Sequence, residues 1–433
     1  LFWFRRDLRL DDNRGLWEAL RSGYKVLPLF IFDTHILQEL PRNDARVTFL
    51  YDRLQALRRA LEESCGGCLA LYKGTPEEVF GRLVSEGNVQ AVYANADYEP
   101  YAQQRDTRVA GQLGQAGIPF RTFRDQVIFE KNEVVKDNGD PYVVYTPYMR
   151  KWKELFYQLG ELVDYDTRPY LKNVLAERLP EGPDLSELGF TRAGIQVPDY
   201  DLSAARIDAY AATRDIPAKD GTSRLGPHLR FGTVSVRKIV REAQQAANET
   251  FWNELIWREF FMQILWHFPR TVHESFKKPY DRIRWRNREE EFELWKEGKT
   301  GFALVDAGMR QLKQTGTMHN RVRMLAASFL CKHLLIDWRW GEAYFAEKLL
   351  DYELASNVGN WQWAAGSGVD AAPYFRIFNP HTQAAKFDPD GKYIRQWVPE
   401  YGTDAYPPPM VDHKQARERC LMSYKAALDG AAG

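Results

Sequence analysis

One short stretch in the second half of the chain pairs a carboxylate with an indole at helical spacing. In the segment 253–257, Glu254 and Trp257 are three residues apart, so they share one face of a helix. A carboxylate beside a flat indole can hydrogen-bond an aromatic base and stack on it. Taken alone, the pair is more typical of a surface glutamate beside a packed tryptophan, so its meaning depends on what else the chain carries.

A second stretch gathers an amide, a guanidinium and a thioether. Asn320, Arg323 and Met324 follow at i, i+3 and i+4 and share a helix face, and Asp351 comes later, just before an aromatic string that includes Trp361 and Trp363. An Arg–Asp pair is commonly structural, yet perturbed charge pairs also gather at functional sites.

A third candidate is the turn Gly221-Thr222-Ser223-Arg224-Leu225-Gly226-Pro227. Its two hydroxyls and its backbone N–H groups precede an expected helix start, and Arg224 adds positive charge. Such a turn can hold phosphate oxygens, although an ordinary helix cap is the more common use of these residues.

Bulk properties exclude several classes of protein. The 433 residues have a formal net charge of zero, so charge alone does not predict nucleic-acid binding. We find no apolar run long enough to span a bilayer and no targeting core at the start, and we expect a cytosolic protein. The four cysteines include one CxxC, Cys65 and Cys68, without a second pair at metal-ligand spacing, so we expect no metal site; a redox role for this pair is left open.

The elements expected around these residues change character along the chain. Short apolar segments at 1–4, 25–32, 68–74, 89–98 and 120–129 alternate with amphipathic helices at 44–63, 75–86 and 100–117. This rhythm predicts an α/β fold with a doubly wound, Rossmann-like parallel sheet, although no GxGxxG follows a strand. From about 201 onward the 3.6-residue pattern predicts an all-helical region, with the unusual residues on loops between the helices. We therefore expect an N-terminal domain at 1–130, a surface connector at 131–200 and a helical domain at 201–433.

The motifs together resemble one family. GTSRL, NELIWREF, EGKTG, DAGMRQL, MHNRVRM, NWQWAAGSGVDAAPYFRIFNP and KYIRQW stand in the order and at the spacing of the photolyase and cryptochrome family. Within it, the chain looks like a class I photolyase for cyclobutane pyrimidine dimers. The (6-4) photolyases and animal cryptochromes carry a histidine pair near the stretch where Met324-Leu325-Ala326 stands here.

The resemblance implies that the 1–130 domain binds an antenna and that the helical domain binds FAD and DNA. Residues that would contact FAD are Tyr210, Thr222, Ser223, Arg224, Leu225, Gly226, Asn320, Arg323, Asp351, Tyr352, Glu353 and Asn357. Gly226 replaces a serine frequent in relatives, which removes one hydroxyl contact to phosphate. A cation near the flavin ring would favour its anionic reduced form.

Further roles follow from the same resemblance. Residues expected to bind DNA or the flipped-out dimer are Arg214, Glu254, Trp257, Arg258, Phe261, Asn320, Arg321, Trp363 and Gln383. Glu254, Asn320, Met324 and Asn357 would be catalytic, and Trp361, Trp338 and Trp285 would relay electrons to the flavin.

The implied activity is light-driven repair of ultraviolet-damaged DNA by electron transfer from excited, reduced, anionic FAD to the dimer, carried out by a monomeric carbon–carbon lyase. Two alternatives are a cryptochrome-type blue-light sensor without repair and a dark flavin electron carrier. A second, antenna chromophore is left open, since Tyr98-Glu99-Pro100-Tyr101-Ala102 lacks the Asn-Glu that folate-binding relatives show.

Overall fold

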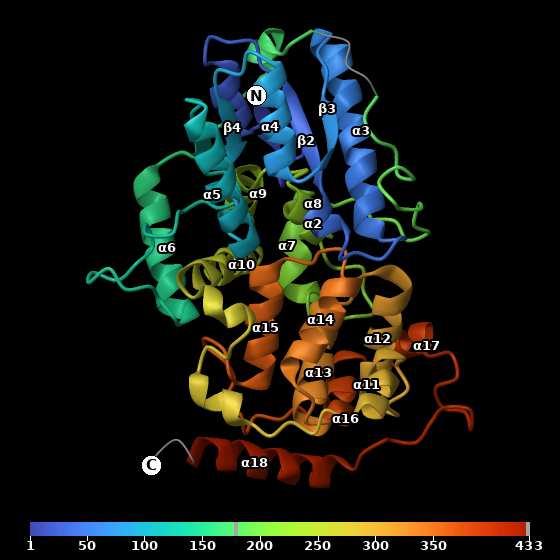
Figure 1. The fold of residues 1–433 in the computed structure, drawn as a ribbon. Helices are drawn as coiled ribbons and strands as arrows, with labels where there is room; N and C mark the ends of the chain where they lie inside the picture. The colour runs from blue at the N-terminus through green and yellow to red at the C-terminus, as the bar shows by residue number, and fades with distance from the viewer. Residues whose placement is uncertain (177–180, 430–433) are drawn as a thin grey trace. The chain divides into compact units, whose positions relative to one another are not determined.

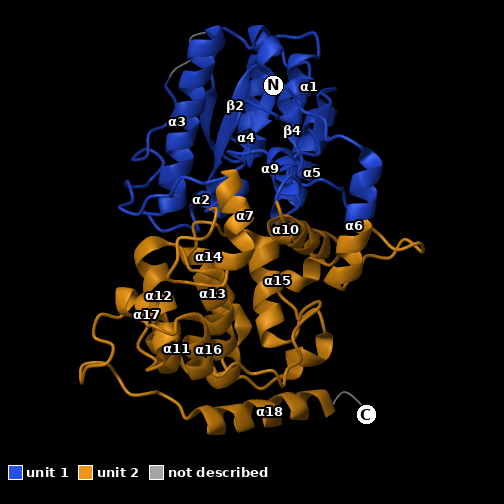
Figure 2. Ribbon diagram, turned by 180° about the vertical axis from the view of Figure 1, so that it is seen from behind, with its two compact units in different colours: residues 1–134, 152–202, 224–246 blue, residues 135–151, 203–223, 247–433 orange. Residues whose placement is uncertain are grey.

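The computed structural model describes residues 1–176 and 181–429, and the chain divides into two compact units. The first unit comprises Leu1–Val134, Trp152–Leu202 and Arg224–Ala246, and the second comprises Val135–Lys151, Ser203–Ser223 and Ala247–Gly433 (Figure 2). These units do not coincide with the expected ranges 1–130, 131–200 and 201–433.

A five-stranded parallel sheet forms the centre of the first unit, with strand order β3-β2-β1-β4-β5 (Figure 1). The strands are β1 (Phe2–Phe4), β2 (Pro28–Asp33), β3 (Ala70–Gly74), β4 (Val92–Asn95) and β5 (Phe120–Phe123). Phe2 and Phe4 belong to one hydrophobic cluster, whereas Trp3 belongs to another. Because successive side chains of a strand point to opposite faces, both faces of the sheet are buried. This confirms the predicted doubly wound fold.

Helices cover each face of this sheet. Leu16 of α1 (Arg14–Leu20) and Leu54 of α3 (Ala45–Cys65) pack on one face. Phe80 of α4 (Pro76–Glu86) and Val109 of α5 (Pro100–Gln115) pack on the other. The short helix α2 (Thr34–Leu37) follows β2.

Part of the expected connector contributes to the core of the first unit. The side chains of Leu171, Val174, Leu188 and Phe190 are buried against the sheet in the cluster of Phe2 and its neighbours. Two helices lie in the segment, α6 (Tyr145–Leu159) and η1 (Arg168–Asn173), and α6 belongs to the first unit only from Trp152 onward. The interpretation of 131–200 as a surface connector is therefore wrong for these residues, and residues 177–180 lie outside the described part.

Buried ion pairs join the segment 224–246 to the loops that follow β1 and β5. This segment forms α8 (Gly226–Phe231) and α9 (Val236–Gln244). Arg237 contacts Asp12 at 2.9 Å and Asp125 at 2.9 Å, and Arg9 contacts Asp125 at 2.7 Å, with all four side chains nearly fully buried. Burial opposes the charge of Asp125, but Arg9 and Arg237 hold the pKa of its carboxyl below the usual range. Removing one partner would leave a buried charge unpaired, so this network fixes the segment in place.

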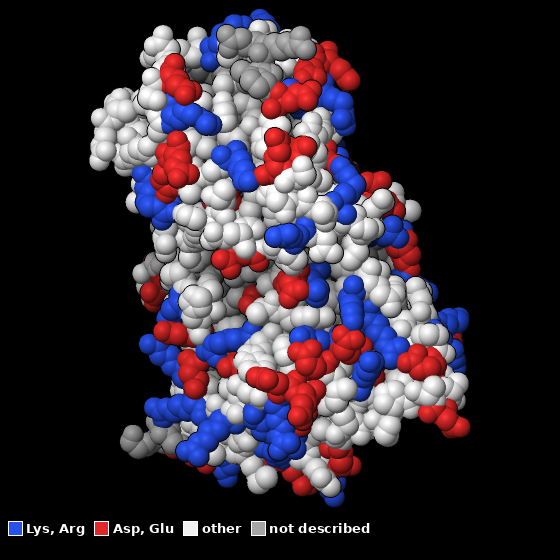
Figure 3. Space-filling view, turned by 45° about the vertical axis from the view of Figure 1, so that its right-hand side comes forward, with Lys and Arg blue, Asp and Glu red and all other residues white. Residues whose placement is uncertain are grey.

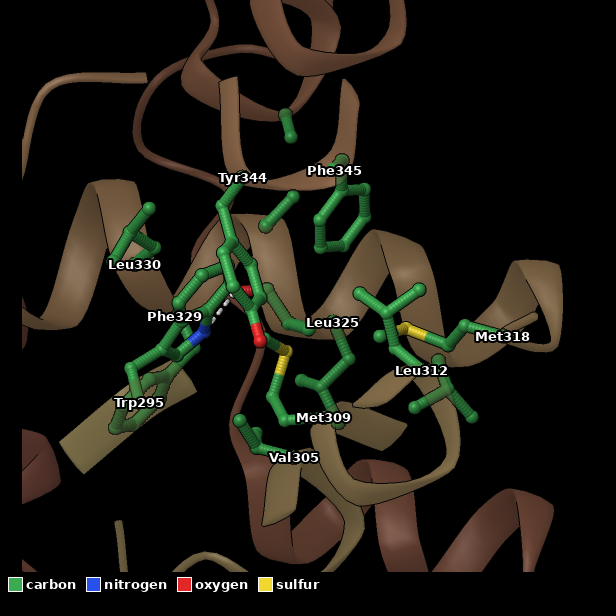
Figure 4. Close-up of a cluster of buried hydrophobic side chains, with 14 of the residues drawn as sticks. Trp295, Val305, Met309, Leu312, Met318, Leu325, Phe329, Leu330, Tyr344 and Phe345 are labelled. Carbon is green, nitrogen blue, oxygen red and sulfur yellow. Dashed lines mark hydrogen bonds between the residues drawn. The ribbon is translucent and has the colours of Figure 1, made fainter. Parts of the chain in front are cut away.

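The second unit is helical. Its helices are α7 (Ala204–Thr213), α10 (Thr250–His267), η2 (Pro269–Val272), η3 (Lys278–Arg282), α11 (Glu289–Lys296), α12 (Ala303–Thr315), α13 (Asn320–Ser328), the π-helical turn η4 (Phe329–His333), α14 (Trp338–Lys348), α15 (Leu354–Ala365), α16 (Pro380–Phe387), α17 (Lys392–Trp397) and α18 (His413–Asp429). Helices α13, α14 and α15 pack around one large apolar cluster that includes Trp295, Leu325 and Phe345 (Figure 4). None of the helices described could cross a membrane.

Helix α15 was not expected from the sequence. It carries Asn357, Trp361 and Trp363, which we had placed on a loop. It packs directly against α10, where a side chain at Gly359 would clash with the ring of Phe261. The absence of a side chain at Gly359 thus allows the two helices that bear the aromatic candidates to lie close together.

Candidate active site

A pocket opens in the second unit between α13, α14, α15 and the loop before α15. It brings together nine of the predicted residues, namely Asn320, Arg323, Met324, Asp351, Tyr352, Glu353, Asn357, Trp361 and Trp363. Phe345 and Leu349 add apolar surface, so the pocket suits a flat, largely apolar group with polar edges.

Arg323 and Asp351 form a two-pronged ion pair along the pocket. Arg323 Nη2 lies 2.9 Å from Asp351 Oδ2, and Nη1 lies 3.2 Å from Oδ1. Arg323 Nε also donates to the backbone oxygen of Met318 at 2.7 Å. Three hydrogen bonds therefore fix the guanidinium plane, which places a permanent positive charge beside whatever occupies the pocket.

Asn357 is oriented by the neighbouring helix. Its amide group donates to the backbone oxygen of Glu342 at 3.1 Å and to Glu342 Oε1 at 2.9 Å. Burial raises the pKa of Glu342, although the Asn357 hydrogen bond opposes that rise. With its NH₂ group used in this way, Asn357 Oδ1 is the atom that can accept a hydrogen bond from a ligand.

Glu353 has a structural use in addition to its expected one. Its side chain accepts a hydrogen bond from the backbone N–H of Ser356 at 3.0 Å and so caps the N-terminus of α15. The carboxylate is buried, and the cap fixes the start of the helix that presents Asn357. Its predicted contact with FAD stays a prediction.

The two tryptophans of α15 form different parts of the pocket wall. Trp361 is buried and packs edge-on against Phe345, with ring centroids 4.9 Å apart, whereas Trp363 is half-buried. Trp338 belongs to the same apolar cluster as Trp361, and Trp285 packs against it. Their predicted relay of electrons stays a prediction.

Helix α10 carries a second group of predicted residues that are not among those lining the pocket. Glu254 Oε1 lies 2.5 Å from Nη1 of Arg214, which follows α7. The ring of Trp257 is stacked on that of Tyr145, with centroids 3.6 Å apart and planes 7° from parallel. Because α10 packs on α15, this wall is held next to the helix that carries Trp363.

The remaining DNA candidates differ in accessibility. Arg321 is paired with Asp215 at 2.5 Å and lies 4.5 Å from the ring centre of Phe387. Gln383 stands one turn before Phe387 on α16 and is half-buried, as is Arg258 on α10. Phe261 is only 5% exposed and packs between α10 and α15, so the structure gives it a packing role and little surface for direct contact with DNA.

The expected phosphate turn crosses the boundary between the units. Tyr210, Thr222 and Ser223 belong to the second unit, and Arg224, Leu225 and Gly226 to the first. Arg224 is exposed and has a positive φ of 55°, and Gly226 begins α8. Their grouping around a phosphate stays a prediction.

Three residues of this region were not among the sequence candidates. Tyr145 covers Trp257, His319 caps α13, and Phe375 is 60% exposed on the loop after α15. Tyr145 lies far from Trp257 in the sequence, so its role could not be deduced locally.

Comparison with known proteins agrees with this architecture. Residues 1–168 match the family model for DNA photolyase, and residues 251–404 match the FAD binding domain of DNA photolyase. The deoxyribodipyrimidine photo-lyase of Halobacterium salinarum is 38% identical over 99% of both chains, and that of Escherichia coli is 36% identical over 99% of both. The chain belongs to the DNA photolyase family.

Solved structures show the same fold. A bacterial class III photolyase from Agrobacterium tumefaciens has a TM-score of 0.88 at 36% identity, covering 99% of this chain and 97% of that one. A cryptochrome from Synechocystis has a TM-score of 0.84 at 26% identity, covering 97% and 98%. An archaeal photolyase from Sulfolobus tokodaii, described with two FAD molecules, has a TM-score of 0.82 at 33% identity, covering 98% and 99%. The predicted family, the fold and an FAD-binding photolyase domain are confirmed, whereas the class I assignment stays a prediction.

Proposed function

We propose that this protein repairs cyclobutane pyrimidine dimers in DNA in a light-driven reaction that uses reduced FAD. The observation that carries the proposal is the pocket in which a fixed Arg–Asp pair, an oriented amide and two tryptophans converge. FAD bound there supplies the light-absorbing electron donor. Repair by this route needs one bound FAD, and an antenna would widen the absorbed band without changing the chemistry.

The residues of the pocket fit the cofactor. Arg323, held by Asp351, provides a positive charge that stabilises an anionic ring. Asn357 Oδ1 offers an acceptor for a ring N–H, and Trp361 provides an apolar wall. This donor set matches a flat ring that is apolar on its faces and polar at its edges.

The α10 side of the site has the residues for binding damaged DNA. Trp257 and Trp363 provide indole faces on which the two joined pyrimidines of an extruded dimer can stack, and Glu254 can accept a hydrogen bond from a thymine imide N–H. Arg214 and Arg321 supply positive charges for backbone phosphates. Acidic and basic side chains are interspersed on the face seen in Figure 3, so such local arginines would carry the electrostatic part of binding.

The test is repair of an irradiated thymine oligonucleotide by the reduced holoprotein. We expect the absorbance of the thymine band to recover only under near-ultraviolet or blue light. If the absorbance of the thymine band does not change under light although the flavin is fully bound, repair is refuted. The sensor role that the likeness to a cryptochrome allows would then be favoured.

Glu254 provides a sharper version of this test. Glu254→Ala is expected to slow repair by roughly tenfold or more, because a hydrogen bond to a charged group is lost, while flavin content stays unchanged. Since Glu254 does not line the pocket, a variant that purified without flavin would show that its assigned role is wrong.

A further inference from the structure

Both arginines expected to hold phosphates are paired with carboxylates of the same chain. Arg214 Nη1 lies 2.5 Å from Glu254 Oε1, and Arg321 Nη2 lies 2.5 Å from Asp215 Oδ1. All four side chains keep some exposure to solvent, between 23% and 49%. These pairs can therefore be opened by a competing anion, unlike the buried pairs around Asp125.

The two pairs belong to one cluster. Arg214 and Asp215 are consecutive residues, and the imidazole of His319 hydrogen-bonds the backbone of Arg214. His319 Nδ1 also accepts a hydrogen bond from the backbone N–H of Arg321 at 3.2 Å, at the start of α13. The end of α7 is thus tied to α13, so the backbones of both arginines are fixed and only their side chains are left to exchange partners.

The partner of Arg214 distinguishes the two pairs. Asp215 has no predicted role in the site, whereas Glu254 is the carboxylate expected to hydrogen-bond the extruded base. While Arg214 occupies Glu254 Oε1, the strongest donor near that carboxylate is the guanidinium and not a base. A backbone phosphate that binds Arg214 would compete with Glu254 for the same N–H groups, and it would also bring a second negative charge close to the carboxylate.

We propose that the Arg214–Glu254 pair is a latch that couples phosphate binding to recognition of the dimer. When a backbone phosphate binds Arg214, the ion pair with Glu254 breaks. The Glu254 carboxylate then forms a new hydrogen bond only when the imide N–H of an extruded pyrimidine donates to it. Undamaged DNA, which leaves its bases stacked, opens the latch without replacing the lost partner. The latch therefore weakens binding to undamaged DNA more than binding to dimer-containing DNA. This inference rests on the proposed function.

The test is a double-mutant cycle on DNA affinity, measured in the dark with a duplex holding one thymine dimer and with the same duplex undamaged. Glu254→Gln is expected to strengthen binding to undamaged duplex by about two- to fivefold, since the competing charge is gone. The same change is expected to weaken binding to the dimer duplex by roughly tenfold. In an Arg214→Gln background, the gain on undamaged duplex is expected to vanish.

Asp215→Asn is the matched control. It breaks the neighbouring Arg321 ion pair but changes no residue expected to contact the extruded base, so it is expected to raise the affinity for both duplexes by the same factor. Flavin content and melting temperature of each variant report folding, and Arg214→Lys replaces Arg214→Gln if the latter purifies unfolded. Lysine keeps the charge but loses the forked guanidinium, so a reduced gain from Glu254→Gln is expected in that background as well.

Two results would overturn the latch. One is a Glu254→Gln variant whose affinity for undamaged duplex is unchanged while Arg214 is intact. The other is a gain of equal size with and without Arg214. Failure of the proposed function has a different signature, because the unmodified protein would then bind both duplexes equally and repair neither.

Discussion

Replacing Tyr145 would test whether the wall that faces the dimer is preorganised. The Tyr145 ring lies 3.6 Å from that of Trp257 in a nearly parallel stack, and it also packs edge-on against Phe260. Its hydroxyl donates to the backbone oxygen of Asn253 at 2.8 Å, and its backbone N–H donates to Asp370 Oδ2 at 3.2 Å. Tyr145 therefore ties the first turns of α10 to the loop that follows α15.

The size of the effect follows from these contacts. A stacked aromatic pair contributes about 0.5–1.5 kcal/mol beyond the area that it buries. If Trp257 loses this support in Tyr145→Ala, its indole must be ordered when the base binds, so dimer affinity should fall by about 2- to 12-fold. Loss of the buried ring should also lower the free energy of unfolding by about 3 kcal/mol.

Three measurements separate these effects. Affinity for a dimer-containing duplex should fall while affinity for undamaged duplex changes little, because the hydrogen bonds of Tyr145 go to Asn253 and Asp370 and not to a phosphate-binding arginine. Tyr145→Phe keeps the ring and loses only the bond to Asn253, so it should retain most of the dimer affinity. Unchanged dimer binding in Tyr145→Ala, with the variant folded and loaded with flavin, would refute the idea that Trp257 needs this support.

Other perturbations give equally direct outcomes. Gly341→Ala would clash with Cη2 of Trp361, so we expect a loss of about 1–3 kcal/mol in stability and a lower flavin-to-protein absorbance ratio, and a full flavin load would contradict the placement of Trp361 in the pocket wall. His319 has a pKa lowered to about 4 by burial and by its two arginine neighbours, so the unfolded chain takes up its proton at higher pH than the folded one. Stability should therefore fall as pH drops from 6.5 toward 4, by at most about 3 kcal/mol, and thermal melting of His319→Asn should depend less on pH in this window. Arg321→Gln should weaken binding to damaged and undamaged DNA alike and reduce the slope of log affinity against log salt by about 0.9, and an unchanged slope would argue against a phosphate contact.

Local pattern predicted most of the elements that position the site. The strands and the helices of the first unit have the periodicities that we expected, and Thr75 and Glu78 form the predicted helix start as a capping box. Glu254 and Trp257, whose spacing predicts a shared helix face, both lie on helix α10. In these segments the chain's own periodicity and caps agree with the final fold, which is why they could be read without tertiary information.

The sequence was less informative where tertiary packing decides. Helix α15 is buried on nearly every side, and polar Asn357 and Gln362 are among its buried residues. It therefore lacks the separation of an apolar buried face from a polar exposed face that marks a helix in a pattern. Likewise, nothing local shows that Arg237 will pair with residues near the N-terminus. Both depend on contacts between residues far apart in the chain.

The two sides of the proposed site are held by different kinds of contact. On the side of the pocket, Arg323 makes three hydrogen bonds and Asn357 is anchored to α14, so these groups keep their positions before any ligand arrives. On the side of α10, Glu254 is held by a single, partly exposed ion pair that another anion can replace. A cofactor that stays bound through many turnovers requires a fixed site, since each displacement would misalign electron transfer. DNA must instead be bound and released in each cycle, and exchangeable ion pairs allow release at a rate that a rigid, fully buried site would not.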